Sequence, residues 1–319
     1  MKKNSRQMVR TWRPLDGVLL FDKPLELSSN TALQKVRRLF QAEKAGHTGT
    51  LDPLATGLLP ICFGEATKFS TALLDADKSY TAMLRLGQTT TTGDAEGLIV
   101  KQRPVTFLMS DLDAVLERFR GVIQQLPPMH SALKHHGMPL YEYIRKGITI
   151  ERELREVVIH ELTMNRYSGL EMEIAVRCSK GTYVRTLAED IGEALGCGAH
   201  LIALRRTAIA HFSLVAGYTL TQLTEMTDIE RQACLLQVDD LMPDIPKLQL
   251  DAAQIKRLAQ GQRLGLDTGL PDGKIGLYGP DGFIGTGVQQ GRRVAPDRLL
   301  ANVAKQAAKI NLMENIVEP

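Results

Sequence analysis

The chain has 319 residues, of which 44% are hydrophobic and 24% are charged, and its formal net charge is +3. This composition is ordinary for a globular protein with one large and one small domain, and the mild positive charge neither requires nor excludes a nucleic-acid partner. The four cysteines stand far apart without a C-x-x-C pair, which argues against a zinc site and a disulfide framework and favours a cytoplasmic location.

The first part of the chain predicts a leader, a strand and a helix. Residues 1–16 are basic but lack the apolar core of a signal peptide, so we expect a flexible leader. Residues 17–21 predict a strand, and the polar residues before position 31 offer N-caps for a helix over 31–41. Basic residues outside its apolar stripe form either a solvated face or a phosphate-binding patch: Lys35, Arg37, Arg38 and Lys44.

Residues 46–60, GHTGTLDPLATGLLP, combine glycines and prolines at a density that predicts a shaped loop. The pair Asp52-Pro53 is typical of a helix start, with Asp52 as the N-cap. One interpretation is therefore a capping aspartate in a structural turn, and the other is a carboxylate presented on a rigid loop for chemistry. The two are compatible, because an aspartate at a helix N-terminus stays ionised and a rigid ionised carboxylate can act as a nucleophile or general base.

The middle of the chain alternates between short strands and helices. We expect strands over 58–63, 79–86 and 98–105, and helices over 64–75 and 110–120, the latter capped by Ser110. Residues 88–97 form a polar loop that carries Asp94. No apolar run is long enough to cross a membrane, so we expect no membrane contact.

Residues 129–147 interleave basic and aromatic side chains between flanking prolines and glycines. Cations suit phosphates and rings suit stacked bases, so one interpretation is an RNA-contacting arm; a mobile surface insertion is the other. The adjacent histidines His135 and His136 point in different directions and have no carboxylate at ligand spacing, so we reject a metal site there.

The remaining elements favour an α+β fold. Residues 154–167 and 170–177 predict a hairpin, residues 181–195 a turn and helix, and residues 200–212 a strand that carries Arg205 and Arg206. Many strands with few β-α-β alternations predict a mixed, mostly antiparallel sheet flanked by helices. Residues 239–246 are a candidate linker, and beyond them short strands separated by glycine turns predict a small β-barrel.

Several long motifs resemble those of the TruB-type tRNA pseudouridine-55 synthases. The central run resembles the family's catalytic motif, and the others follow in the family's order over most of the chain: GVLLFDKPLELSSN, KSYTAMLRLG, TTTGDAEG, CSKGTYVRTLAEDIG and HLIALRRTAIAHF. The resemblance implies a pseudouridine synthase-like catalytic domain over 17–246, with a thumb-like RNA-binding insertion at 127–152. It also implies a PUA-like RNA-binding domain over 247–319.

By this resemblance the protein isomerises uridine 55 in the T-loop of tRNA to pseudouridine, after the base is flipped out of its stack. The reaction breaks the uracil–ribose bond and rejoins the base through carbon 5. Because it is redox-neutral and uses no external donor, we expect no cofactor and no metal. The expected partner is the T-stem-loop of tRNA, and we expect a monomer without an obligate protein partner.

The resemblance gives Asp52 the role of nucleophile or base, by a route that the sequence leaves open. Arg185 is its expected partner, since a guanidinium keeps a carboxylate charged, and a cation at a helix start indicates a nearby anion. The other matched positions are a tyrosine that stacks on the base, two that line the uracil pocket, a histidine that fills the vacated space and two backbone-contacting lysines: Tyr80, Tyr183, Leu204, His47, Lys23 and Lys68.

Other interpretations are testable against the same residues. A non-catalytic tRNA-binding or tRNA-folding chaperone on the same fold is the main alternative, and replacing Asp52 by Asn separates the two functions. Asp94 is expected to hold an active-site arginine rather than to serve as a second acid. A phosphate-binding NTPase lacks the G-K-[ST] sequence after its glycines, and a methyltransferase lacks the doubly wound glycine-rich opening.

Overall fold

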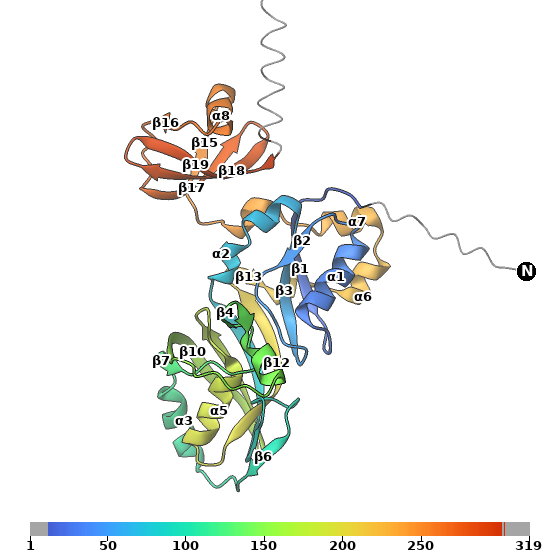
Figure 1. The fold of residues 1–319 in the computed structure, drawn as a ribbon, viewed down its shortest axis with the longest axis vertical. Helices are drawn as coiled ribbons and strands as arrows, with labels where there is room; N and C mark the ends of the chain where they lie inside the picture. Colours follow the sequence, from blue (N-terminus) through green and yellow to red (C-terminus); the bar gives the residue numbers. More distant parts are fainter. Residues whose placement is uncertain (1–11, 302, 304–319) are drawn as a thin grey trace, which may run out of the picture.

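The computed structural model describes residues 12–301 and residue 303, so eleven residues of the predicted leader lie outside the described part (Figure 1). A ten-stranded sheet forms the larger part of the molecule. Its strands are β1 (Gly17–Lys23), β2 (Ala45–His47), β3 (Ala55–Phe63), β4 (Lys78–Leu86), β7 (Gly121–Gln125), β10 (Arg155–Ser168), β11 (Glu171–Cys178), β12 (Ala199–Ile209), β13 (Phe212–Ser213) and β14 (Tyr218–Thr219).

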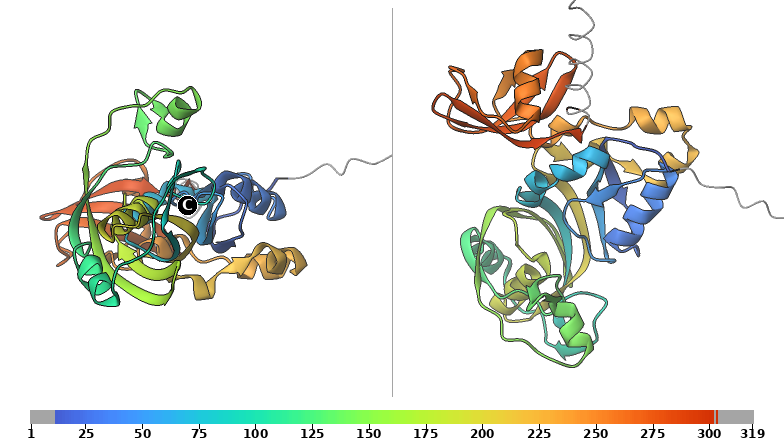
Figure 2. Two further views of the ribbon diagram at one scale, coloured as in Figure 1. Left: turned by 90° about the horizontal axis from the view of Figure 1, so that it is seen from below. Right: turned by 45° about the horizontal axis from the view of Figure 1, so that its top comes forward.

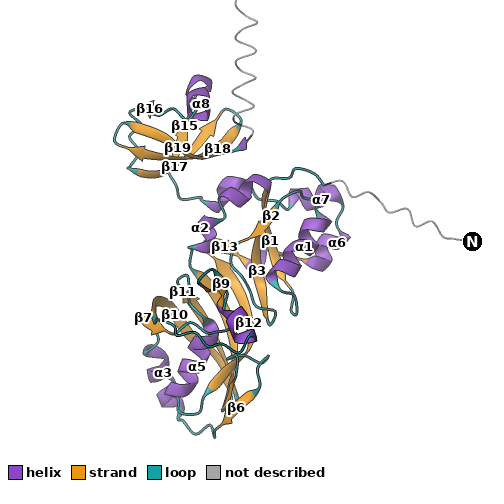
Figure 3. Ribbon diagram, in the orientation of Figure 1, coloured by secondary structure: helices purple, strands orange, loops and turns teal. Residues whose placement is uncertain are grey.

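The strand order is β14-β1-β3-β12-β4-β11-β10-β7, with β2 beside β3 and β13 beside β12. In this sheet β1 and β14 are parallel, as are β3 and β12, and the other described pairs are antiparallel. The prediction of a mixed, mostly antiparallel sheet flanked by helices is confirmed (Figure 3).

The half of the large sheet that contains β1 and β3 is covered on both faces. Leu19 and Phe21 of β1 pack with the helix α1 (Ser29–Leu39), while Val18 and Leu20 pack on the opposite face beneath a 3-10 turn, η1 (Gly64–Lys68), and the short helix α2 (Thr71–Leu74). This double cover explains why β1 is a continuous apolar run rather than an alternating one.

Helices α3 (Met109–Glu117) and α5 (Val184–Ala194) pack on the other half of the sheet, which contains β10 and β11. Leu187 and Ile191 of α5 are fully buried against β4, β10 and β11, as their spacing of four residues predicts. The two halves meet along β4 and β12, which make the most extensive strand pair of the molecule.

Three sequence predictions differ from the structure. No helix follows Asp52: residues 53 and 54 form a turn, the carbonyl of Asp52 accepts a bond from the amide of Ala55 at 3.0 Å, and β3 begins there. Pairing of β3 with β1 and β12 satisfies the backbone that a helix would otherwise satisfy. The helix expected over 64–75 is divided into η1 and α2, and α3 begins at Met109 rather than after Ser110.

Residues 127–152 contain a two-stranded hairpin, β8 (Lys134–His135) and β9 (Met138–Pro139), followed by α4 (Leu140–Arg145). Seen from below, this green segment stands away from the body of the molecule (Figure 2). The remaining elements of the larger part are β5 (Gln88–Thr90), β6 (Ile99–Gln102), η2 (Leu214–Ala216), α6 (Leu220–Glu225), α7 (Asp228–Ala233) and η3 (Val238–Leu241). Within the described residues, the helices are too short or too polar to span a bilayer.

The smaller part is a curled five-stranded sheet in the order β15-β17-β18-β19-β16, with its own apolar core. Its elements are β15 (Lys247–Gln249), α8 (Ala252–Ala259), β16 (Leu264–Gly265), β17 (Gly273–Gly279), β18 (Gly282–Gln290) and β19 (Arg293–Leu299). Direct bonds attach it to η1: Lys68 Nζ donates to the Leu299 carbonyl at 3.2 Å, and Glu65 Oε2 accepts the Ala301 amide at 2.6 Å.

Candidate active site

Asp52 lies in a turn that is anchored on both sides. Before it, the buried side chain of Ser29 accepts a bond from the Leu51 amide at 2.8 Å and donates to the Leu51 carbonyl at 2.9 Å. After it, the carbonyl of Pro53 accepts a bond from the amide of Glu26 at 3.0 Å. The carboxylate is therefore carried by a fixed backbone, while its side chain is 45% exposed.

Arg185 joins two carboxylates. In the first turn of α5, its Nη2 lies 3.0 Å from Asp52 Oδ2 and its Nη1 lies 3.3 Å from Asp94 Oδ2. The same guanidinium donates to the carbonyls of Thr92 at 3.2 Å and His130 at 2.7 Å. Because Arg185 and Asp94 are buried, the planar fork of the guanidinium has one orientation. This fixed guanidinium holds the carboxylate of Asp52.

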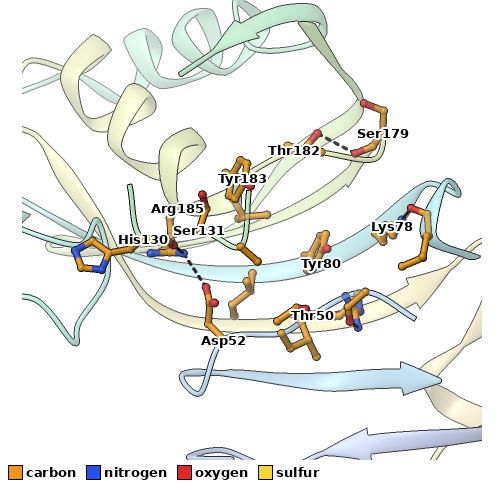
Figure 4. Close-up of a pocket in the computed structure, with 18 residues that line it drawn as sticks. Thr50, Asp52, Lys78, Tyr80, His130, Ser131, Ser179, Thr182, Tyr183 and Arg185 are labelled. Carbon is orange, nitrogen blue, oxygen red and sulfur yellow. Dashed lines mark hydrogen bonds and ion pairs between the residues drawn. The ribbon is translucent and has the colours of Figure 1, made fainter. Parts of the chain in front are cut away.

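A pocket of about 300 Å³ opens beside this ion pair (Figure 4). Asp52 and Arg185 face each other at one end, and the ring of Tyr80 lies next to them. Tyr183 and Leu204 also line the pocket. Tyr80 and Leu204 pack against the apolar cores of both halves of the sheet, so the pocket lies at the junction where β4 and β12 cross from one half to the other.

Tyr183, the residue that precedes α5, is held through its backbone. The amide of Tyr183 donates to Gln125 Oε1 at 3.0 Å, and Gln125 Nε2 donates to the Tyr183 carbonyl at 3.3 Å. Gln125 is 2% exposed, so these two bonds fix the start of α5 from the end of β7. Neither Gln125 nor His130 was predicted from the sequence, because a single polar residue carries no signal of a partner tens of residues away.

Two buried basic residues, Lys78 and Arg206, also line the pocket. Burial lowers the pKa of Lys78 to about 8, and it lowers the pKa of Arg206 as well. Burial raises the pKa of the Tyr80 phenol, whereas the neighbouring charge of Arg206 acts in the opposite direction. From the sequence, Arg206 was predicted only as part of a strand, and no role was predicted for Lys78.

Three domain models of one family match the sequence, one after another, between residues 37 and 300. These are the TruB family pseudouridylate synthase N-terminal domain over residues 37–184, the tRNA pseudouridylate synthase B C-terminal domain over 185–242, and the pseudouridine synthase II TruB C-terminal domain over 246–300. The chain belongs to the TruB family of pseudouridine synthases. It is therefore an isomerase.

Individual relatives agree with this assignment. The tRNA pseudouridine synthase B of Methylobacillus flagellatus is 56% identical over 92% of this chain and 98% of its own length. That of Chromohalobacter salexigens is 50% identical over 94% and 99%, respectively. Among solved structures, the crystal structure of a Cbf5-Nop10-Gar1 complex is similar with a TM-score of 0.68 and 24% identity, covering 89% of this chain and 84% of that one, which shows a shared fold.

The pocket of this TruB-family chain gathers five of the residues singled out from the sequence: Asp52, Tyr80, Tyr183, Arg185 and Leu204. The other three lie outside its lining. His47 ends β2, and burial lowers the pKa of its imidazole. Lys23 is fully buried and donates to the carbonyls of Pro24 at 2.9 Å and Leu27 at 2.6 Å.

In the structure Lys23 and Lys68 both bond protein groups, and their expected contacts with the RNA backbone stay a prediction. Burial also lowers the pKa of Lys23 to about 8, against the opposing effect of Asp52. Lys68 is partly exposed, but its ammonium bonds Glu65 at 2.7 Å and the C-terminal sheet, so it joins the two parts of the protein.

Proposed function

We propose that this protein converts uridine 55 in the T-loop of tRNA to pseudouridine, with Asp52 as the catalytic carboxylate. The observation that carries the proposal is the Asp52–Arg185 ion pair at the end of a pocket lined by Tyr80. The relatives from M. flagellatus and C. salexigens, which are named tRNA pseudouridine synthase B, support tRNA as the substrate because they match over nearly their full lengths.

The proposed reaction needs one accessible carboxylate. The N1–C1′ bond of the uridine breaks, a C5–C1′ bond forms, C5 loses a proton and N1 gains one, so atoms and electrons balance without a redox partner. Asp52 combines a half-exposed carboxylate with a buried counter-ion that holds one of its oxygens. Such a group is oriented and charged, which is what a nucleophile or a base at this position requires.

The target base has to leave the RNA stack, which costs a few kcal/mol. The ring of Tyr80 offers a surface on which the flipped base can stack, and aromatic stacking contributes about 1–3 kcal/mol per base. Tyr183 and Leu204 complete the walls of the pocket. In this proposal His47, in its Gly-rich loop, fills the space that the base leaves.

Two regions outside the pocket are proposed to bind the RNA body. Residues 127–152 stand away from the sheet, and His130 at their base contacts Arg185 through its carbonyl, so closure of this thumb-like segment on RNA would be sensed at the ion pair. The curled sheet beyond residue 246 is the PUA-like part. The five gathered residues line one pocket of a single chain, so the proposed chemistry needs no residue from a second protein, and a monomer without an obligate partner is part of the proposal.

The deciding experiment uses an unmodified T-stem-loop RNA and an unmodified full-length tRNA, with pseudouridine mapped by carbodiimide adducts. Wild-type protein is expected to modify uridine 55 alone. Asp52→Asn is expected to bind the RNA and give no product, and Asp75→Asn, which removes an exposed carboxylate paired with Lys180, is the matched control with wild-type activity. Modification of another uridine, or product from Asp52→Asn, contradicts the proposal.

The same proteins address the chaperone alternative. A chaperone that does not modify RNA would accelerate tRNA refolding while forming no pseudouridine, and its Asp52→Asn variant would match the wild type in both respects. Refolding is followed by the aminoacylation competence of misfolded tRNA. Product at uridine 55 by the wild type excludes this alternative as the only function.

A further inference from the structure

Arg206 lies on β12, which is paired with β3 on one side and β4 on the other. On β12 it is directly opposite Tyr80 of β4 on one side and Gly57 of β3 on the other. It is 1% exposed and is the largest fully buried side chain of the described residues. Its backbone leaves no room for a side chain at position 57, where a Cβ would lie 2.3 Å from the Arg206 carbonyl oxygen.

The guanidinium of Arg206 connects the turn of Asp52 to Tyr80. Its Nε donates to the Leu58 carbonyl at 2.7 Å, and its Nη2 donates to the Gly49 carbonyl at 3.1 Å. Tyr80 is its direct cross-strand neighbour on β4, and the positive charge of Arg206 lowers the pKa of the Tyr80 phenol against the effect of burial. The rigid fork of arginine suits the two carbonyl acceptors, which a lysine ammonium cannot reach together.

No ion pair among the described residues includes Arg206, so its charge is buried without a carboxylate partner. Burying such a charge lowers the stability of the fold, because desolvation of a cation costs several kcal/mol. An apolar residue of similar size would be expected to stabilise the fold more. Its neighbour Arg205 shows the ordinary case, since it points to the other side, is 44% exposed and pairs with Asp22 at 2.6 Å. A buried cation that disfavours folding and lines the pocket indicates a role in the site.

We propose that Arg206 is a positioning residue of the pocket: it holds residues 49–52 and the Tyr80 ring in one arrangement and places an unneutralised positive charge beside the ring. The inference rests on the proposed function, because the arrangement matters only if Asp52 and Tyr80 act on the same base. It predicts that Arg206 affects the rate of the chemical step through Tyr80 and has little effect on RNA affinity.

The test is a double-mutant cycle on the full-length protein with Arg206→Met, Tyr80→Phe and both changes together. Single-turnover rates are measured at saturating T-stem-loop RNA, and dissociation constants by filter binding. A bond from a charged donor to a buried acceptor predicts a rate loss of about tenfold to a hundredfold for Arg206→Met, with the dissociation constant within about threefold of wild type. The double variant is expected to be no slower than the slower single variant, because both changes disturb the same pairing of the Arg206 charge with its cross-strand neighbour Tyr80.

Two further variants distinguish positioning from folding. Arg205→Met is the matched control, since it removes the adjacent arginine from the opposite side of the strand, and its rate is expected to equal that of wild type. Arg206→Lys keeps the charge and loses the fork, so it is expected to be folded and slow, with a rate between those of wild type and Arg206→Met. If Arg206→Met does not fold, the rate and the dissociation constant of Arg206→Lys are compared with those of wild type and Arg205→Met instead.

A wild-type rate in the folded Arg206 variants overturns the inference. So do rate losses of Arg206→Met and Tyr80→Phe that multiply in the double variant, or a loss that equals the unfolded fraction measured by circular dichroism. These outcomes are distinct from failure of the proposed function, which would appear as absence of pseudouridine at uridine 55 in the wild type itself.

Discussion

Asp94→Asn separates two possible roles of the second carboxylate near the pocket. Asp94 has a 4% exposed side chain; its Oδ2 pairs with Arg185, and its Oδ1 accepts bonds from the Thr92 hydroxyl and from the Glu96 amide at 3.1 Å. Asparagine has nearly the same shape and keeps one acceptor for these donors. The substitution therefore removes the charge opposite Arg185 and little else.

The magnitude follows from the remaining partners of Arg185. Removing one member of a buried ion pair costs about 3–5 kcal/mol when the other charge is left alone. Here Asp52 and two carbonyls still hold the guanidinium, so the expected loss of stability is about 2–3 kcal/mol. Arg185 then neutralises Asp52 alone and is free to turn toward it, which weakens the carboxylate as a nucleophile or base; we expect a rate loss of about tenfold to a hundredfold.

The assay is single-turnover pseudouridine formation below the melting temperature of the variant, beside urea unfolding of both proteins. A positioning role predicts the moderate rate loss together with the loss of stability. Unchanged rate and stability refute the reasoning, because they mean that Asp94 does not restrain Arg185. A loss of rate above about ten-thousandfold in a folded, RNA-binding variant also refutes the positioning role, since it indicates that Asp94 takes part in the chemistry.

Two further predictions concern stability. Burial, with the neighbouring Asp190, raises the pKa of Glu189 to about 7, so the folded state binds more protons than the unfolded state between pH 4.5 and 7 and stability falls across that window. Glu189→Gln is expected to raise the melting temperature at pH 8 by about 2–4 °C and to leave it unchanged at pH 4, as measured by calorimetry; an equal rise at both pH values contradicts this. Gly57→Ala adds a Cβ into the Arg206 backbone at a φ of +99° and is expected to lose about 3 kcal/mol or more in urea unfolding, whereas Gly265→Ala, where the Cβ meets open space, is the control; comparable losses in the two variants would contradict the contact.

The elements that the sequence predicted well are those whose signals are local. The helix after Ser28 has its N-cap bond from the Thr31 amide to the Ser28 hydroxyl, and its apolar stripe is buried as spaced. The Asp52-Pro53 pair does not start a helix, although its helix-start signal was equally clear; Asp52 lies at a turn instead. Pairing with distant strands, which contributes most of the backbone bonds of β3, overrides the local preference of an Asp-Pro pair.

The pocket was predictable to the extent that motifs describe it. Asp52, Tyr80 and Arg185 each lie in a long motif, and the structure places them together. Gln125 and Arg206 form their contacts across separations of 58 and 148 residues, so neither their partners nor their burial can be deduced from the surrounding sequence. A buried polar residue in a strand looks the same in sequence as an exposed one, and only the register distinguishes them.

The Asp52–Arg185 ion pair spans the two halves of the large sheet, since Asp52 precedes β3 and Arg185 begins α5. Strands β4 and β12 pass through both halves without a break, and their register is continuous on either side of the pocket apart from two bulges. A pair formed across two independent domains would lengthen whenever a hinge opened. Here paired strands join the two halves, so the sheet holds the carboxylate and its counter-ion at a fixed distance. In the proposed function, residues 127–152 communicate with this pair through the His130 carbonyl, which accepts a bond from Arg185.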